Sequence, residues 1–233
     1  MDAFTRGLWN IYETVHREGV SQKLQLGIHR SDYMFDVGDA GQDGDPSAFR
    51  LTQIEINTIA SAFGALSTRL FATHQRILRR FNETLLDGKR FQGEAVPRNQ
   101  VSENLARGMI YAVDQYRRAR ETSKSKSSSR LAILFLDTEV TRNIFDQRQL
   151  EFAINDQSED IVVLRKTLRE AELNAKLDEK TRILTVDGFE IALAYFRVGY
   201  SPDHYPSGES QEIKTRGYSL LFRLKMIVLA FRL

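Results

Sequence analysis

Two runs of consecutive apolar residues on either side of a helical pattern constrain the fold most. Residues 131–136 and 161–164 are nearly unbroken apolar stretches, which is typical of strands that are buried on both faces. Between them, residues 144–154 repeat apolar positions with the period of a helix. A strand, a helix and a second strand in this order predict a βαβ unit with parallel strands.

The patterns on both sides of this unit extend the α/β layer. A helix is expected around residues 168–177, and strands over 182–186 and 190–196 are joined by the turn Asp187-Gly188. Before residue 120, apolar spacing predicts helices over 4–15, 63–81 and 101–116, and strands over 24–35 and 51–57. The helix over 4–15 should end near Gly19, and a Gly- and Asp-rich loop should cover 38–46.

A polar, low-complexity stretch marks the expected domain boundary. Residues 121–130 are rich in Ser, Lys and Arg, a composition that cannot form a packed core. We therefore expect a first unit at 1–120, a linker at 121–130, a second domain at 131–206 and a divergent tail at 207–233. At 233 residues, 42% of them apolar and 27% charged, the chain is long enough for two modest domains.

Charge and cysteine content exclude several classes of function. The 33 basic and 31 acidic residues give a net charge of +2, so no global field draws the chain to nucleic acid or anionic lipid. The absence of cysteine excludes disulfides and thiolate chemistry and is compatible with a cytoplasmic protein. The four histidines, which lack metal-ligand spacing, are expected to have surface or packing roles. The first residues lack the pattern of a secretory leader.

Alternation in the strand at 51–57 places oxygen ligands together. Gln53, Glu55 and Asn57 fall on one face, opposite Ile54 and Ile56. Carboxylate and amide oxygens suit Mg²⁺, which completes its shell with phosphates and water. A solvated outer face of a half-buried strand explains the same pattern.

Four segments, in one order, resemble those of eukaryotic glutathione synthetases. They are residues 29–35 (HRSDYMF), 53–59 (QIEINTI), 142–148 (RNIFDQR) and 195–200 (YFRVGY). The likeness runs over about residues 2–206 and is interrupted by the serine-rich stretch. It implies an α/β fold with a partial ATP-grasp-like unit and a small parallel-sheet substrate-binding domain.

The resemblance also implies roles for residues of the first unit. Glu55 and Asn57 would hold Mg²⁺ on the phosphates of ATP, with Glu55 also in the ATP site, and Arg30 would contact substrate. A surface ion pair is the alternative for Arg30. The loop at residues 59–62 would bind substrate, and backbone N–H groups there precede a helix and can meet an anion. A loop kept small for packing fits the sequence as well. The loop residues are Ile59, Ala60, Ser61 and Ala62.

Two further segments would supply substrate contacts. One contains Arg142, Asn143 and Gln147, at a strand end and a helix start where βαβ folds bind ligands. The family has a glutamate where this chain has Thr141, so a partner for the substrate's ammonium is lost. Asp146 and Arg148 fit helix-surface charges. The other segment comprises Arg197, Val198, Gly199 and Tyr200, where Gly199 permits a turn that aims Arg197 and Tyr200 into a cleft.

The implied activity is ATP-dependent ligation of γ-glutamylcysteine to glycine, with Mg²⁺ as cofactor and ATP as substrate. The sequence lacks the family's later lysine-led, glycine-rich nucleotide segment, so we expect an incomplete chain that is inactive alone. The alternative is a non-catalytic fragment or isoform that binds a peptide or a full-length partner subunit. A homodimer stays open.

Two remaining segments carry competing interpretations. Residues 218–233 are apolar but too short and too charged for a membrane span, and the abrupt change favours an altered reading frame or splice over a buried or membrane-surface segment. Basic residues around 117–130 resemble a nucleic-acid patch, but without interleaved aromatic residues a solvated linker is the better interpretation, and no nucleic-acid partner is expected.

Overall fold

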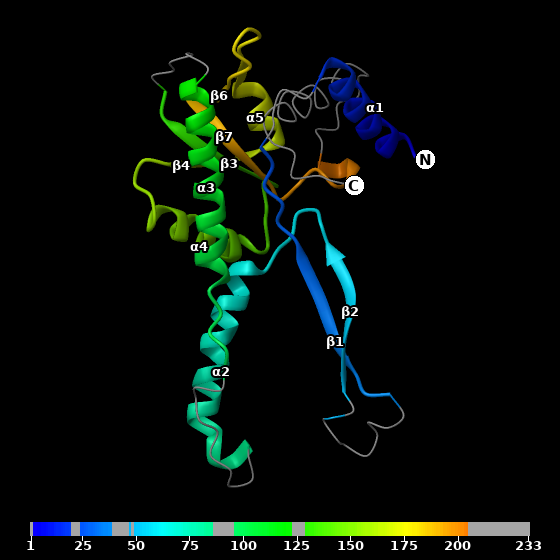
Figure 1. The fold of residues 1–233 in the computed structure, drawn as a ribbon, viewed down its shortest axis with the longest axis vertical. Coiled ribbons are helices and arrows are strands. Elements are labelled where there is room, and N and C mark those ends of the chain that lie inside the picture. The colour runs from blue at the N-terminus through cyan, green and yellow to red at the C-terminus, as the bar shows by residue number, and fades with distance from the viewer. Residues whose placement is uncertain are drawn as a thin grey trace.

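The computed structural model describes residues 2–19, 24–38, 47, 49–85, 96–122 and 129–204. Two arms project from a mixed α/β body (Figure 1). One arm is the hairpin of β1 (Arg30–Asp36) and β2 (Arg50–Asn57), and the other is helix α2 (Gly64–Leu85). The remaining elements form the body.

The body is built on a five-stranded sheet of order β4-β3-β7-β6-β5. Strand β3 pairs in parallel with β4 on one side and β7 on the other, as the βαβ prediction requires. Strands β5, β6 and β7 are antiparallel, so the sheet is mixed and the expected parallel sheet is confirmed only in part. The turn Asp187-Gly188 explains this, because a two-residue hairpin joins antiparallel neighbours. The strands are β3 (Leu131–Asp137), β4 (Val162–Thr167), β5 (Ala175–Leu177), β6 (Leu184–Val186) and β7 (Phe189–Phe196).

Helices cover the sheet and complete the core. Helix α3 contacts β7 and α4, and α5 lies against β4. Residues 132–136 of β3 have no exposed surface, as expected for a continuous apolar run between two neighbouring strands. Ile11 and Val15 of α1 belong to the same apolar cluster. The helices are α1 (Ala3–Glu18), α3 (Val101–Thr122), α4 (Ile144–Asn155), α5 (Leu168–Asn174) and the short 3₁₀ helix η4 (Pro202–His204).

Several expected boundaries change. The strand begins at Arg30 instead of residue 24, because Leu26 and Ile28 reach the core from a segment without regular structure. The last three residues of the helix expected at 168–177 form strand β5. Helix α3 extends into the predicted linker as far as Thr122. Residues 123–128, most of the loop at 38–46 and the tail at 207–233 lie outside the described residues.

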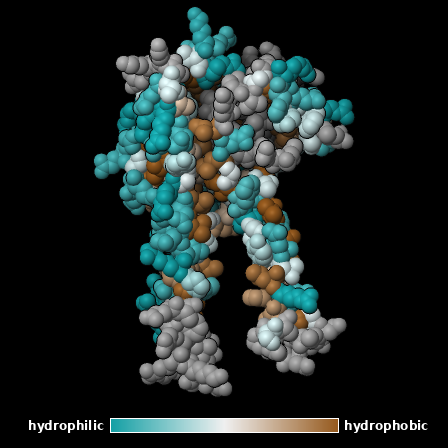
Figure 2. Space-filling model, in the orientation of Figure 1, coloured by the Kyte–Doolittle hydropathy of each residue, from teal (hydrophilic) through white to brown (hydrophobic). Residues whose placement is uncertain are grey.

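The arms differ from the body in what they expose. Strands β1 and β2 make most of their contacts with each other. Helix α2, by contrast, contacts helices α3 and α4 of the body. Apolar side chains gather along both arms, and open space separates the arms in this view (Figure 2). Among the described helices, none has the length and apolar character needed to cross a membrane.

Candidate functional site

Strand pairing brings the predicted polar residues together near the base of the hairpin. Arg30 pairs with Asn57, and Asp32 pairs with Glu55, so these four side chains share one face. Arg30 donates from Nε to Asp32 Oδ1 at 2.9 Å and from Nη2 to Asp32 Oδ2 at 2.9 Å. Asn57 Nδ2 donates to Asp32 Oδ2 at 3.3 Å. The bond from Arg30 lowers the pKa of Asp32, and the same bond raises the pKa of Arg30.

An irregularity in the pairing changes the composition of this face. The register shifts between Asp32 and Tyr33, so Gln53 pairs with Tyr33 and donates to Ser31 Oγ at 2.5 Å. The prediction that Gln53 shares a face with Glu55 is therefore wrong, because simple alternation cannot foresee a bulge. Asp32 takes its place. The sequence contained a signal for this, because Asp32 lies two residues after Arg30 and residues at this spacing in a strand share a face.

The oxygen donors of this face set the kind of metal that fits. Glu55 offers a carboxylate, and Asn57 offers Oδ1 because its amide nitrogen is used by Asp32. The described residues contain no group of three or more His, Cys, Asp or Glu side chains that can hold a metal ion. Carboxylate and amide oxygens are hard donors, and donors of this kind suit a cation that completes its shell with phosphate and water, as Mg²⁺ does.

The loop that follows Asn57 is tied to the body by short polar contacts. Ser61 Oγ donates to the backbone oxygen of Asn57 at 2.9 Å and to that of Ile28 at 3.3 Å. Tyr195 OH donates to the backbone oxygen of Ser61 at 3.3 Å. Ala60 has a positive φ of 47°. Ile59 is exposed, and Ala62 is half-buried. A cavity of about 30 Å³ beneath this loop is large enough for water and too small for a peptide.

The start of helix α2 is already capped. Asp146 accepts hydrogen bonds from the backbone N–H groups of Phe63, Ala65 and Leu66 at 3.0, 3.0 and 3.1 Å. The expectation that the first N–H groups of this helix are free for an anion is wrong for these three. The interpretation of Asp146 as a surface charge is also wrong, because its side chain is buried. Arg148, by contrast, lies on the helix surface and pairs with Glu151 at 2.9 Å.

Arg197 and Tyr200 have different surroundings. Arg197 is buried, and its Nη1 donates to Tyr195 OH at 3.2 Å and to Asp146 Oδ2 at 3.3 Å. Tyr200 is 51% exposed and lies edge-on to His204, while Val198 is buried. The prediction that Gly199 aims both side chains into one cleft is therefore wrong. Gly199 does provide the turn, with φ of 96°, and His204 Nδ1 accepts its N–H at 3.1 Å.

A crevice of about 560 Å³ lies at the carboxyl ends of β3 and β4, where α/β sheets commonly bind ligands. Thr141 lines it, and its hydroxyl donates to Asn143 Oδ1 at 2.9 Å. Arg165, which sequence reasoning missed, also lines the crevice and donates to Asp137 Oδ2 at 3.1 Å and Gln147 Oε1 at 2.8 Å. Burial lowers the pKa of Arg165. Its place at the end of a buried strand was the available signal.

The residues of the second predicted segment therefore divide between surface and interior. Arg142 is exposed and Asn143 precedes α4. Gln147 is 1% exposed, and its Nε2 has no hydrogen-bond partner among the described residues. Asp146 and Gln147 are adjacent, so α4 connects the capped start of α2 to the floor of the crevice.

Comparison with known proteins identifies relatives of this chain. A family model described as the eukaryotic glutathione synthase ATP-binding domain matches residues 1–190. Glutathione synthetase of Dictyostelium discoideum is 37% identical over 216 residues, which cover 92% of this chain and 42% of that protein. Glutathione synthetase of Homo sapiens is 37% identical over 204 residues, which cover 88% of this chain and 38% of that protein.

A solved structure supports the fold. The structure of a glutathione synthetase-like effector from Globodera pallida in its apo form matches with a TM-score of 0.64 and 16% sequence identity. The match covers 97% of this chain and 54% of that chain. The chain thus spans less than half the length of the two relatives named above. Because the family model matches most of its residues, the chain belongs to the eukaryotic glutathione synthase family.

Proposed function

We propose that this chain provides the metal–phosphate and peptide-binding part of a ligase that joins γ-glutamylcysteine to glycine with ATP. One observation carries the proposal: Arg30, Glu55 and Asn57 share one face of the hairpin in a member of this family. This face brings a guanidinium, a carboxylate and an amide oxygen together, which are the groups that a metal–phosphate and peptide site would use.

Each residue has a role that its chemistry suits. Glu55 and Asn57 Oδ1 would hold Mg²⁺, which would neutralise charge on the phosphates of ATP. Arg30 would pair with a carboxylate of the peptide. Asp32 accepts from Nε and Nη2 of Arg30, so, within the described part of the chain, Nη1 is the nitrogen left for substrate. Residues 1–120 would belong to an ATP-grasp-like unit, and residues 131–206 would form the substrate domain.

The other residues predicted to contact substrate also belong to this proposal, each at the position that the structure gives it. The loop at residues 59–62 and Thr141, Arg142, Asn143 and Gln147 would orient the peptide. Arg197 is bonded to Asp146 and Tyr195, so it would act from within the body, with Val198 and Gly199 shaping its turn and Tyr200 at the surface. A cytoplasmic location and a homodimer remain predictions.

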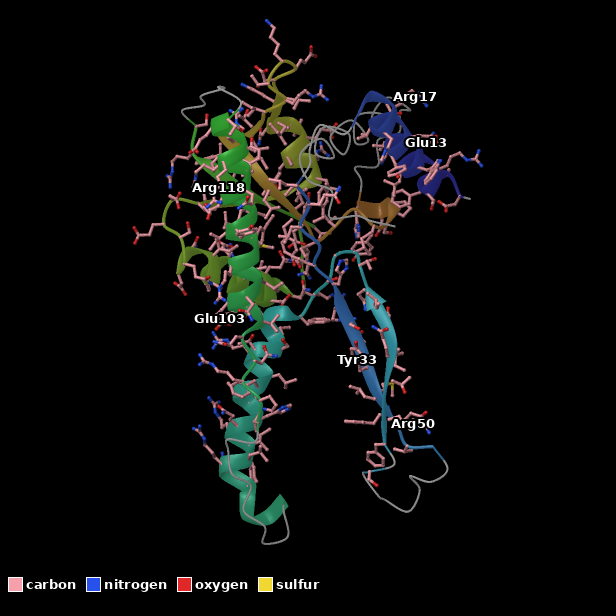
Figure 3. All side chains as sticks on the ribbon, viewed as in Figure 1. Glu13, Arg17, Tyr33, Arg50, Glu103 and Arg118 are labelled. Atoms are coloured by element: carbon pink, nitrogen blue, oxygen red, sulfur yellow. The ribbon has the colours of Figure 1, made fainter. Side chains whose placement is uncertain are left out.

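Binding measurements test this proposal directly. Calorimetry with γ-glutamylcysteine, and separately with Mg²⁺ and ATP, should detect both ligands. Glu55→Gln should weaken the binding of Mg²⁺ and ATP about tenfold or more, because a charged oxygen donor is lost. Glu13→Gln is the matched control, since Glu13 lies exposed on α1, far from the hairpin (Figure 3). Equal affinities for both variants would overturn the metal role.

We expect a polypeptide of residues 1–233 to bind without turnover. Its sequence contains no lysine-led, glycine-rich segment to hold the phosphates, and each missing clamp typically costs about 10² to 10³ in rate. Peptide product and phosphate would be followed together with ATP, Mg²⁺, γ-glutamylcysteine and glycine. Stoichiometric formation of both, abolished by Glu55→Ala, would contradict the expectation.

The exposed apolar arms favour a second candidate function, a subunit that pairs with a full-length synthetase. Four apolar residues of α2 are exposed at spacings of 4, 7 and 4, which places them on one stripe. They are Leu66, Leu70, Ile77 and Phe81. Such stripes mark interaction surfaces when they are large and contiguous. Co-purification with a full-length relative, lost on Leu70→Lys, would support this candidate, and unchanged recovery would oppose it.

A further inference from the structure

Helix α2 begins without a capping residue of its own. Its first residue is Gly64, and Phe63 before it accepts the first helical hydrogen bond, from Ser67 N at 2.9 Å. Phe63 therefore stands at the N-cap position, where Ser, Thr, Asp or Asn normally satisfies the free N–H groups. A phenyl ring cannot do this. The helix needs an acceptor from elsewhere.

Asp146 supplies that acceptor from helix α4. Its Oδ1 takes the N–H groups of Ala65 and Leu66, as the side chain of an N-cap residue does. Its Oδ2 takes the N–H of Phe63 and is 3.3 Å from Arg197 Nη1. The side chains of Asp146 and Arg197 are each 5% exposed, so this carboxylate is buried with its acceptor capacity used.

The same contact holds Phe63 in a backbone conformation that it would not adopt freely. Its φ is 71°, in the left-handed region that bulky residues avoid. This conformation places the ring near Arg30, whose Cζ lies 6.0 Å from the ring centroid, within the range of a cation–π contact. The hydrogen bond that Asp146 accepts from Phe63, together with the ring of Phe63, thus connects the body to the arginine on the hairpin.

We propose that Asp146 is a positioning residue that caps α2 from α4, holds Phe63 in its strained conformation and so sets Arg30 for its ligand. The ligand part rests on the proposed function. Asp146 itself touches no reacting atom. In Asp146→Asn the remaining oxygen still accepts from Ala65 and Leu66, as Asn does at an N-cap. The amide N–H, in place of Oδ2, would face the N–H of Phe63, so the bond that holds Phe63 would be lost without a large change in volume.

Two readouts test the cap without any ligand. In Asp146→Asn, amide exchange at Phe63 should rise by about tenfold to a hundredfold, because its hydrogen bond to a charged acceptor is lost. The Nε–H resonance of Arg30 should also move as the ring leaves. Asp156→Asn is the matched control, since Asp156 lies exposed at the other end of α4. An equal rise in exchange throughout β3 and β7, or no rise at Phe63, would overturn the proposal.

A second variant covers the case in which Asp146→Asn does not fold. Phe63→Gly accepts a positive φ without strain and removes the ring. It should keep slow exchange at Ala65 and Leu66 while shifting the Arg30 resonance; an unmoved resonance would overturn the link to Arg30.

Calorimetry then separates this inference from the proposed function. Asp146→Asn should lower γ-glutamylcysteine affinity about tenfold, and an unchanged affinity would overturn the positioning role. If the unmodified chain binds no peptide while exchange and resonance change as expected, the proposed function fails and the positioning of Arg30 stands.

Discussion

Strand β3 in the body and strand β2 in the hairpin arm are opposites in burial. Residues 132–136 of β3 have no exposed surface, whereas Leu51, Ile54 and Ile56 of β2 are 65%, 58% and 54% exposed. Both segments are rich in β-branched or large apolar residues, and both form strands. The difference shows that strand propensity and burial are separate properties.

Neighbours explain the difference. Strand β3 lies between β4 and β7 under a cover of helices, while β1 and β2 have only each other in their sheet. A two-stranded hairpin is marginal by itself. Polar contacts at its base and along the loop to α2 therefore have a large part in fixing the arms, whereas the body is held by apolar burial.

The largest expected effect tests this contrast in stability. Phe135→Ala removes a fully buried ring and should lower the free energy of unfolding by about 3 to 5 kcal/mol. Leu51→Ala, on the exposed arm, should change it by about 0.5 kcal/mol or less. Denaturant titration of both variants measures the two values. Similar losses would break the distinction, because they would mean that the arm is buried in solution.

The crevice in the body provides the second test. Thr141→Glu introduces the carboxylate that the family resemblance implies at this position and should strengthen γ-glutamylcysteine binding by about tenfold to a hundredfold, because a charge-assisted hydrogen bond is gained. Thr138→Glu is the control, since Thr138 also lines the crevice but is not among the predicted substrate-binding residues. Calorimetry on a full-length chimera checks both, and no gain for Thr141→Glu would remove it from the substrate site.

Local patterns in the sequence predicted the body better than the site. Continuous apolar runs specified β3 and β4, and the turn Asp187-Gly188 specified the β6–β7 hairpin, because these signals lie within a few residues. The backbone N–H groups that Asp146 accepts from are 80 to 83 residues away in the sequence, so no local period contains them.

The two failures at the site have the same origin. The register shift between Asp32 and Tyr33 depends on pairing between strands, and it places Gln53 on the opposite face from Glu55 and Asn57. The burial of Arg197 depends on Asp146 of α4 and Tyr195 of β7. Tertiary neighbours, which one sequence does not display, decided both positions.

A smaller effect is expected on the α2 arm. Replacing Leu70 and Ile77 by Gln changes two exposed apolar residues, so the free energy of unfolding should shift by about 1 kcal/mol or less in total. Self-association at high concentration should decrease, because an apolar stripe is broken. Sedimentation and denaturant titration measure the two effects. A loss of several kcal/mol would mean that the stripe is buried in the folded protein.

The smallest effect concerns ion pairs, where arm and body again differ. Arg30 and Asp32 are 37% and 36% exposed, whereas Arg120 and Glu190 in the body are 16% and 2% exposed. The Arg30 bond lowers the pKa of Asp32 below its usual value of 3.8, so its contribution is complete above that pH and is lost as pH falls through the lowered pKa. Water and salt screen this pair.

A carboxyl NMR titration of Asp32 measures this weak coupling. Arg30→Gln should return the pKa of Asp32 toward 3.8, and added salt should move it the same way in the unmodified chain. Burial, followed by the bond to Glu190, raises the pKa of Tyr116 in the body, and salt should leave that shift nearly unchanged because the pair is shielded from solvent. A salt-insensitive Asp32 would place the hairpin base in a buried environment and end the contrast between arm and body.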